Sequence, residues 1–285
     1  MRRLNLPSIT SVDAYSICLS SVTDVELKAR LTDISTDIEA SSAEYVYQAS
    51  ISSIYTIAPL NHARGVDPVV VGHVLKSELV DLYDCHMVQK KPGRRIYDAI
   101  LVSANEKCPF CGGIGRPKSL DHYLPKSKYP QFSVLPQNLI PSCRDCNTGK
   151  GSVLAQAADQ QPIHPYFDSD CFFLEQWVYA RVLYTSPCTL EFFTSIPDGW
   201  SELNFLRVVN HFKDFDLAKR FSIQAAEELS TIIDQRKGYL NNATPVEFAN
   251  YLRSVAGSSA LFINHWRKVM YQTLAADEWF CTHAF

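Results

Sequence analysis

Two Cys-x-x-Cys pairs constrain this chain more than any other feature of its sequence. Cys108 with Cys111, and Cys143 with Cys146, lie within one stretch of 39 residues. Their four sulfurs can converge on one tetrahedral zinc ion with Zn–S bonds of about 2.3 Å. Such a site has no open coordination position, so we expect a structural zinc and look to other residues for chemistry. The alternative is two unrelated pairs, or a disulfide in a secreted protein. The polar residues between the pairs argue against it.

The segment between the pairs predicts a β-hairpin. Ser119 to Pro125 alternates apolar and polar residues, as a short strand does. This alternation sends Asp121 and His122 to opposite faces unless the backbone bends. A second strand-like run covers Asn138 to Pro141, after a loop broken by prolines.

A short helix is expected to follow the hairpin. The run from Cys143 to Gly151 begins it and places Cys146, Asn147 and Lys150 within about one turn. The order is then hairpin and helix, with zinc ligands at the start of each.

Charge is unevenly distributed along the chain. Residues 86–151 contain eleven Lys or Arg and four acidic residues, which makes this stretch +7 and the remainder −10 within a net charge of −3. This asymmetry favours a polyanion site at the cysteine pairs, and the acidic remainder limits indiscriminate binding.

The 285 residues, 46% of them hydrophobic, can bury a sizeable core in one large domain or two smaller ones. The N-terminal residues contain no apolar run long enough for a signal peptide or a membrane span, so we expect a cytoplasmic protein. A reducing compartment also suits cysteines held for metal. The remaining cysteines have no metal-site spacing and are expected to be small buried hydrophobes: Cys18, Cys85, Cys171, Cys188 and Cys281.

The N-terminal flank is predicted to be helical. Thr23 to Glu26 forms a capping box that begins an amphipathic helix within residues 23–57. A second helix is expected from Asp67 and Pro68 through Leu82. The basic link from Lys90 to Arg95 is either a solvated loop or a contact to a DNA backbone. A short helix from Ile96 to Ala104 follows it.

The C-terminal flank begins with a predicted hairpin, residues 177–184 and 190–194, which are rich in β-branched and aromatic residues. Helices are expected at about 201–212, 216–237, 245–256 and 259–276, the third opened by a capping box from Thr244 to Glu247. His164, His211 and His265 are expected to be packing residues rather than ligands. No nucleotide-binding glycine loop occurs, so any energy source would come from a partner.

These elements predict an α+β fold, mostly helical, with a central zinc-pinned ββα core and a small β-hairpin in the C-terminal half. The expected regions are an N-terminal helical region at 1–95, the core with its zinc knuckle at 96–160, and a mainly helical region at 161–285.

The central stretch resembles the HNH endonucleases, in the branch where two Cys-x-x-Cys knuckles clamp a ββα-metal core. The matching pieces are Cys-Pro-Phe-Cys-Gly, Leu-Asp-His-Tyr-Leu-Pro-Lys-Ser, Asn-Leu-Ile-Pro-Ser-Cys and Cys-Asn-Thr-Gly-Lys-Gly, about 45 residues in all. The resemblance implies metal-dependent hydrolysis of phosphodiester bonds in DNA. It also implies a role as an anti-phage defence effector or a restriction-type nuclease.

The resemblance also implies roles for single residues. His122 matches the general base, and Asp121 with Asn147 matches the ligands of one catalytic cation. Oxygen ligands suit magnesium or manganese, although Asn147 stands where many relatives have His and leaves the metal preference open. Asn138 matches the residue that ties the hairpin loop together and aims His122. Phosphate contacts are assigned to the basic residues of the stretch: Lys150, Arg144, Lys126, Lys128, Arg116 and Lys118.

Two other readings of the chain remain open. A catalytically silent zinc-knuckle module could recruit a protein or nucleic-acid partner, but such a scaffold needs only the cysteines. RNA could replace DNA as the substrate, because phosphate contacts dominate affinity for either polymer. An ATPase partner and a homodimer are further expectations, and no membrane partner is expected.

Overall fold

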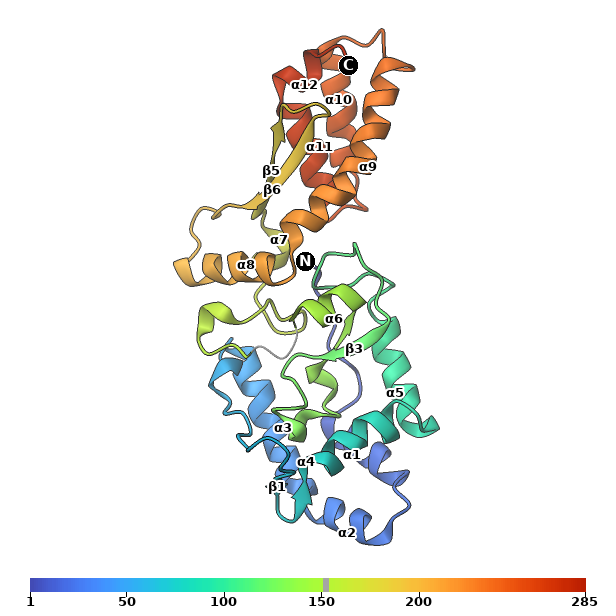
Figure 1. Ribbon diagram of the computed structural model, residues 1–285, viewed down its shortest axis with the longest axis vertical. Coiled ribbons are helices and arrows are strands. Elements are labelled where there is room, and N and C mark those ends of the chain that lie inside the picture. Colours follow the sequence, from blue (N-terminus) through green and yellow to red (C-terminus); the bar gives the residue numbers. More distant parts are fainter. Residues whose placement is uncertain (151–153) are drawn as a thin grey trace.

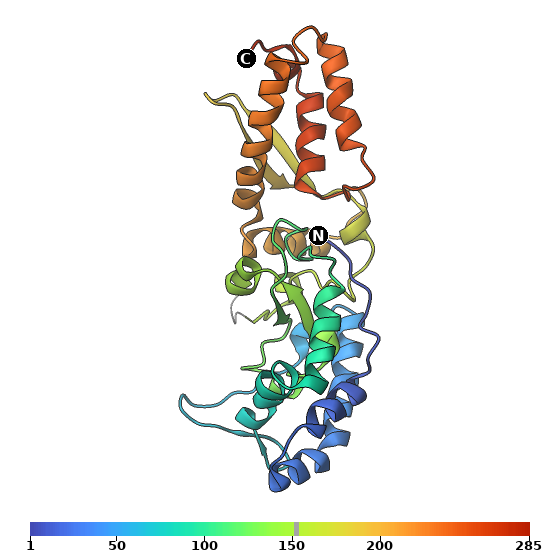
Figure 2. The same cartoon turned by 90° about the vertical axis from the view of Figure 1, so that its right-hand side faces the viewer.

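The computed structural model describes residues 1–149 and 154–285 in full, and the backbone of Lys150. Its elements form an elongated molecule with a lower lobe, built from α1 to α6 and β1 to β4, and an upper lobe that contains β5, β6 and α9 to α12 (Figure 1). Helix α8 lies where the lobes meet, and the second view shows the same elongated shape (Figure 2). The predicted α+β, mostly helical fold is confirmed.

The N-terminal elements are α-helices, one π-helical segment, one 3₁₀ turn and a tight β-hairpin. They are α1 (Ser11–Ser20), α2 (Val25–Asp33), α3 (Ser35–Ser50), η1 (Ile54–Thr56), β1 (Val69–Val71), β2 (Val74–Leu75), α4 (Lys76–Asp81), the π-helical η2 (Leu82–Met87) and α5 (Lys91–Val102).

Two helices stand where one was expected in residues 23–57. Helix α2 is capped by Asp24, whose side chain accepts a hydrogen bond from the amide of Leu27, so the N-cap lies one residue after Thr23. The helical conformation is interrupted at Ile34, which is buried at the junction with α3. Tertiary packing of this apolar side chain prevails over the continuous helical pattern.

The helix expected from Asp67 and Pro68 is wrong in its first part. The β-branched run Val69–Val71 pairs with Val74–Leu75, and Gly72 adopts the positive φ (+54°) of the turn between them. Asp67 does cap a helix, but at a distance, because its carboxylate accepts hydrogen bonds from the amide and hydroxyl of Ser77 in α4. Asp67 is therefore a helix cap, as the sequence indicated, but the helix that it caps begins at Lys76 and not at Pro68.

Helix α5 corrects the expectation that the basic link is a loop. It begins at Lys91 with Pro92 in its first turn, so most of the segment from Lys90 to Arg95 is helix rather than loop. The boundary expected between residues 95 and 96 therefore falls inside this helix.

The central unit has the predicted order of two strands and a helix. Strands β3 (Ser119–His122) and β4 (Leu139–Ser142) pair antiparallel, with His122 opposite Leu139 and Ser119 opposite Ser142. The loop between them contains η3 (Pro130–Phe132) and η4 (Pro136–Asn138), and α6 (Arg144–Lys150) follows β4. All four residues of β4 are buried, so the hairpin lies inside the molecule.

The C-terminal elements agree largely with the sequence. They are η5 (Ala158–Gln160), α7 (Cys171–Leu174), β5 (Val178–Leu183), β6 (Thr189–Thr194), α8 (Glu202–Asp214), α9 (Leu217–Lys237), α10 (Pro245–Ala256), α11 (Trp266–Ala276) and α12 (Glu278–Thr282). The hairpin is antiparallel and the capping box of Thr244 and Glu247 is formed, as predicted. The last expected helix begins only at Trp266, because His265 is its N-cap.

Two hydrophobic clusters meet at the central unit. One contains the N-terminal helices together with Leu120, Val134 and Leu139 of the hairpin region. The other contains the knuckle cysteines, Ile140 and the side chains of the upper lobe. The ββα unit is thus packed from both sides, and the flanking helices determine how its side chains are held. No helix in the described part of the chain combines the length and the apolar character that crossing a membrane requires.

A buried ion pair lies where the lobes meet. Arg207 of α8 donates two hydrogen bonds to the carboxylate of Asp168, at 2.8 and 2.6 Å, and the two residues are only 2% and 1% exposed. Asp168 also accepts hydrogen bonds from the hydroxyl of Ser52 and the amide of His164. Each oxygen of the Asp168 carboxylate therefore accepts two hydrogen bonds from groups of the protein.

We expect Arg207→Met to lower the free energy of unfolding by about 3–5 kcal/mol, because it leaves the Asp168 carboxylate buried without its cation. Arg181→Met is the matched control, since its pair with Glu191 lies at the surface and should contribute at most about 1 kcal/mol. Urea denaturation of both variants measures the difference. Equal losses for the two variants would contradict this account.

Candidate metal centre and active site

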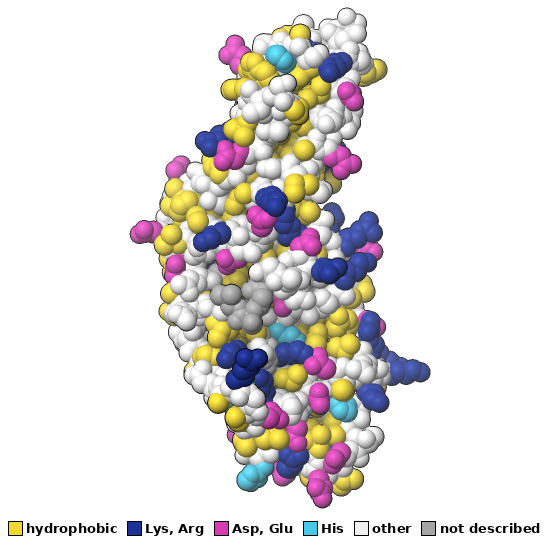
Figure 3. All heavy atoms as spheres, in the orientation of Figure 1, with side chains coloured by type: hydrophobic (Ala, Val, Ile, Leu, Met, Phe, Trp, Pro, Cys, Tyr) yellow, Lys and Arg dark blue, Asp and Glu magenta, His cyan; other side chains and the backbone are white. Residues whose placement is uncertain are grey.

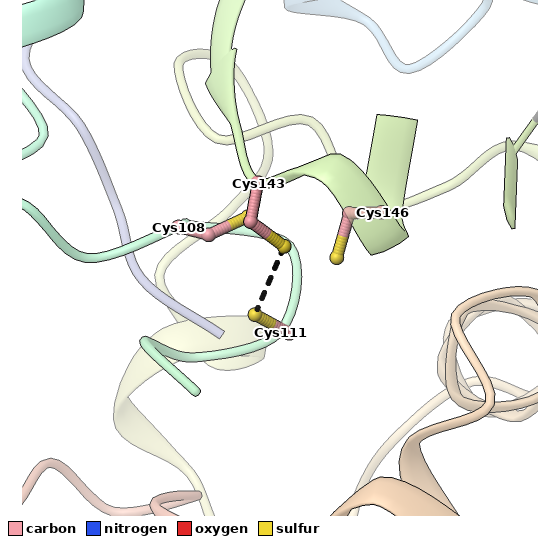
Figure 4. A group of neighbouring side chains, drawn as sticks. All are labelled: Cys108, Cys111, Cys143 and Cys146. Carbon is pink, nitrogen blue, oxygen red and sulfur yellow. Dashed lines mark hydrogen bonds between the residues drawn. The ribbon is translucent and has the colours of Figure 1, made fainter. Parts of the chain in front are cut away.

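Four buried thiols converge between the hairpin and α6. Cys108 and Cys111 lie on the loop after α5, Cys143 ends the hairpin and Cys146 lies in the first turn of α6 (Figure 4). All four sulfurs lie within 4.8 Å of one another, and the Sγ atoms of Cys111 and Cys143 are 4.0 Å apart. Tetrahedral zinc requires sulfur separations of about 3.8 Å. The residues therefore fit a structural metal such as zinc, and in the described residues no other group of this kind occurs.

Glycines let the knuckle loop pass close to the sulfurs. Gly112 and Gly113 adopt positive φ angles of 67° and 92°. The amide of Gly115 donates to the Sγ of Cys111 at 3.4 Å, and a Cβ at this glycine would lie 2.4 Å from the Sγ of Cys143. A side chain at Gly115 would occupy the space that the metal ligands need.

Arg220 of α9 supplies positive charge to the thiol cluster. Its guanidinium donates to the Sγ of Cys146 at 3.3 Å and to the Sγ of Cys143 at 3.7 Å. Burial disfavours its charge, but the hydrogen bond to Cys146 and the charge of the thiolates outweigh burial and raise the pKa of Arg220. Four thiolates around a divalent ion leave a net negative charge, which this arginine partly neutralises. It lies 74 residues after Cys146, and no spacing in the sequence indicated it.

Asp121 and His122 lie on opposite faces of β3, as the alternation of the strand predicted. Asp121 is half-buried and His122 is 7% exposed. The Nε2 of His122 lies 2.8 Å from the carbonyl oxygen of Ser133, which can only accept, so Nε2 carries the proton. In the neutral ring the lone pair is then on Nδ1.

Asn138 closes the loop that follows His122. Its Oδ1 accepts a hydrogen bond from the amide of Leu124 at 2.7 Å, and its Nδ2 donates to the carbonyls of Leu124 and Phe132 at 3.1 and 3.2 Å. The residue is fully buried, and its own carbonyl accepts from the amide of Tyr123. One side chain thus links the end of β3 to both 3₁₀ turns of the loop.

Asn147 lies against the face of β3 that carries Asp121. Its Nδ2 donates to the hydroxyl of Ser119 at 3.2 Å, and Ser119 shares a strand face with Asp121, two residues away. The amide oxygen of Asn147 is therefore the acceptor atom left to this side chain. The structure thus brings Asp121 and Asn147 to one face of the hairpin, with His122 on the other.

The basic residues differ in their surroundings. Arg144 and Lys118 are exposed, Lys128 is half-buried, and Arg116 forms an exposed pair with Glu106 at 3.8 Å. Lys126 is already bound in an ion pair with Asp84, so its charge is largely compensated within the chain. The side chain of Lys150 lies outside the described residues. On the face shown in Figure 3, Lys and Arg side chains gather over the lower half of the molecule.

The other histidines pack as expected. His211 accepts from the amide of Ile163 and donates to the carbonyl of Phe110, and burial lowers its pKa to about 3. His265 caps α11, and burial lowers its pKa to about 4. His164 is hydrogen-bonded to Tyr45. Of the cysteines outside the knuckle, Cys85 and Cys171 are only half-buried, which corrects the expectation that all five are core residues.

Comparison with known proteins reveals one relationship that spans the whole chain. Protein ea31 of Escherichia phage lambda is 36% identical over 292 residues, which cover 98% of each chain. The chain belongs to the ea31 family. The similarity of this ea31-family protein to its phage relative therefore includes the helical flanks as well as the knuckle.

A second similarity of this ea31-family protein is short. Septu protein PtuB of Bacillus thuringiensis is 38% identical over 58 residues, which represent 19% of this chain and 23% of PtuB. No family model matches the chain, and no solved structure matches it.

Proposed function

We propose that this ea31-family chain is a metal-dependent endonuclease of the HNH type that hydrolyses phosphodiester bonds in DNA. The observation that carries the proposal is the orientation of His122, which ends strand β3 of a ββα unit beside four cysteines that fit a structural metal. The hydrogen bond from Nε2 to the Ser133 carbonyl places the lone pair of the neutral ring on Nδ1. An imidazole held in one tautomer is suited to accept a proton at neutral pH.

His122 acts in this proposal as the general base. It accepts a proton from a water molecule as the water oxygen attacks the scissile phosphorus. The bond from phosphorus to the 3′ oxygen then breaks and the leaving 3′ oxygen takes a proton from solvent water, so the products carry a 5′-phosphate and a 3′-hydroxyl. Ser133 keeps the ring oriented while its charge changes, because its carbonyl accepts from Nε2 in both the neutral and the charged imidazole.

Asp121 and the amide oxygen of Asn147 would hold a catalytic magnesium or manganese ion. A carboxylate and an amide are hard oxygen donors, and their position on one face of the hairpin supports the assignment. When bound, the ion would neutralise charge that develops on the phosphate and on the leaving oxygen. Asn138 would act through the loop, by keeping His122 and Ser133 in register.

DNA binding is proposed for the basic face around the knuckle. Arg144, Lys118, Arg116 and Lys128 carry this role, together with Lys150 from the sequence, while the contribution of Lys126 is reduced by its pair with Asp84. We propose an ATPase partner as the source of any energy the reaction needs, or a homodimer whose second site would cut the second strand, and cytoplasmic action. The short similarity to Septu protein PtuB supports the further proposal of an anti-phage defence or restriction-type role.

The test is conversion of supercoiled plasmid by the purified chain with magnesium, with manganese or with EDTA. We expect nicked or linear product with either metal ion and none with EDTA. Structured RNA, tested as a competitor and as a substrate, distinguishes an RNA-directed nuclease. An inert chain that retains zinc and captures a specific partner would favour the alternative of a silent zinc-knuckle module.

A further inference from the structure

The aromatic wall beside His122 comes from outside the ββα unit. Tyr83 belongs to η2 in the N-terminal region, 39 residues before His122 in the sequence. Its ring meets the imidazole edge to face, with centroids 4.4 Å apart and planes at 72°. The hydrogen bond from Nε2 to Ser133 defines the position of that ring atom. The contact with Tyr83 restricts the tilt of the ring as a whole.

Tyr83 is itself anchored to the strand that carries His122. Its hydroxyl donates to the carbonyl oxygen of Leu120 at 3.1 Å, and the amide of the same Leu120 donates to the hydroxyl of Tyr97 at 3.3 Å. Strand β3 has β4 on one side only. The two phenols therefore satisfy backbone groups at its other edge, where a third strand would otherwise be needed. Burial raises the pKa of Tyr83, which keeps its hydroxyl a donor.

Charged groups also hold the phenol ring. The ammonium of Lys126 lies over the ring of Tyr83, 4.9 Å from its centroid, and forms an ion pair with Asp84. Lys126 follows His122 by four residues, whereas Asp84 is the neighbour of Tyr83. The end of β3 and η2 are thus connected twice, by the ring contact of Tyr83 with His122 and by the ion pair of Asp84 with Lys126.

The π-helical geometry of η2 helps its adjacent residues Tyr83 and Asp84 to contact His122 and Lys126, respectively. A π turn contains one more residue than an α turn, and this geometry is frequent at functional sites. Gly93 permits it, because a Cβ there would lie 2.2 Å from the carbonyl oxygen of His86 and 2.6 Å from the Cα of Met87. Helix α5 can therefore pack directly on the widened turn and support Tyr83 from behind.

We propose that Tyr83 is a positioning residue for His122, braced by Lys126 and Asp84, so that the N-terminal region completes the catalytic site. The inference rests on the proposed function for its effect on the reaction, and on the geometry alone for its effect on the imidazole. It predicts that the edge contact, and not the stability that Tyr83 contributes, matters for cleavage.

The experiment compares Tyr83→Leu, Tyr83→Phe and Tyr15→Leu in the full chain. Tyr15 is the matched control, because it is buried in the same hydrophobic cluster but donates its hydroxyl hydrogen bond to the carbonyl of Leu31 in α2 rather than to strand β3. We expect Tyr83→Leu to lower kcat about 10- to 100-fold with little change in KM, because misplacement of a catalytic group acts on the chemical step. Tyr83→Phe keeps the edge contact and should remain within about threefold of the wild type, as should Tyr15→Leu.

A second readout is independent of cleavage. The ¹⁵N NMR spectrum of His122, assigned by its loss in His122→Gln, should show the Nε2-protonated tautomer in the wild type and in Tyr15→Leu. In Tyr83→Leu it should change. An unchanged His122 spectrum in Tyr83→Leu overturns the proposal, as does a loss of kcat that Tyr15→Leu shares. A wild type that cleaves no nucleic acid overturns the proposed function, and the spectrum then decides the positioning role by itself.

Discussion

Replacement of His122 by alanine should lower plasmid cleavage about 10²- to 10⁴-fold, the range that a general base contributes. The variant lacks the imidazole that is proposed to accept the proton of the attacking water. It also leaves the carbonyl of Ser133 without its donor, which costs about 1–3 kcal/mol of stability. The loss of activity should therefore exceed the loss expected from partial unfolding.

The comparison is made on initial rates at saturating magnesium, with circular dichroism and zinc content measured on the same samples. His86→Ala is the control, because this half-buried histidine is hydrogen-bonded to Ser21 and belongs to no proposed site. Its cleavage rate should match the wild type. Full activity in His122→Ala, with metal still required, would assign proton transfer to another group.

Loss of one knuckle ligand should have the largest effect on stability. A structural zinc site supplies about 10–16 kcal/mol of binding free energy, against a total stability of about 5–15 kcal/mol for a typical protein. Cys143 directly follows β4, and the cluster it belongs to also receives hydrogen bonds from Arg220 of the upper lobe. Without the metal, β3, β4, α6 and α9 lose their common anchor. We expect Cys143→Ser to lose zinc and cooperative thermal unfolding.

Metal analysis and calorimetry test this expectation. Cys188→Ser is the matched control, because Cys188 is a buried thiol remote from the cluster and should leave the zinc content unchanged. Dialysis of the wild type against a strong chelator should reproduce the effect of Cys143→Ser, and added zinc should reverse it. Retention of about one zinc ion per chain by Cys143→Ser would show that the four thiols do not act as one site.

Local patterns in the sequence identified the elements that depend on near neighbours. The Cys-x-x-Cys spacing predicted the thiol cluster, and alternation around Asp121 and His122 predicted a strand with these residues on opposite faces. The capping box at Thr244 marked the start of α10 to the residue. For the strand and the cap, the energy that decides the structure comes from groups within about one helical turn or one strand. For the cluster, the short-range signal is the three-residue spacing within each cysteine pair.

Sequence patterns gave wrong secondary-structure predictions where two preferences competed. Asp67 followed by Pro68 is a helix start by propensity, yet the β-branched valines that follow, one of them exposed and two half-buried, pair as a hairpin. Ile34 lies in a continuous helical pattern, but its side chain is buried in the core and the helix is interrupted there. At Val69–Val71 the β propensity of the valines prevails over the helix-start signal, and at Ile34 the burial energy exceeds the small differences in intrinsic helix propensity.

The sequence by itself determined the metal ligands, the order of the ββα unit and the candidates for its chemistry, because each of these is encoded in short-range spacing. Only the tertiary structure decided which distant groups complete the site: Tyr83 beside His122, Arg220 beside the thiols and the pair of Asp168 with Arg207. These contacts join residues 39 or more positions apart. Long-range contacts depend on how whole helices pack, and no short motif records that packing.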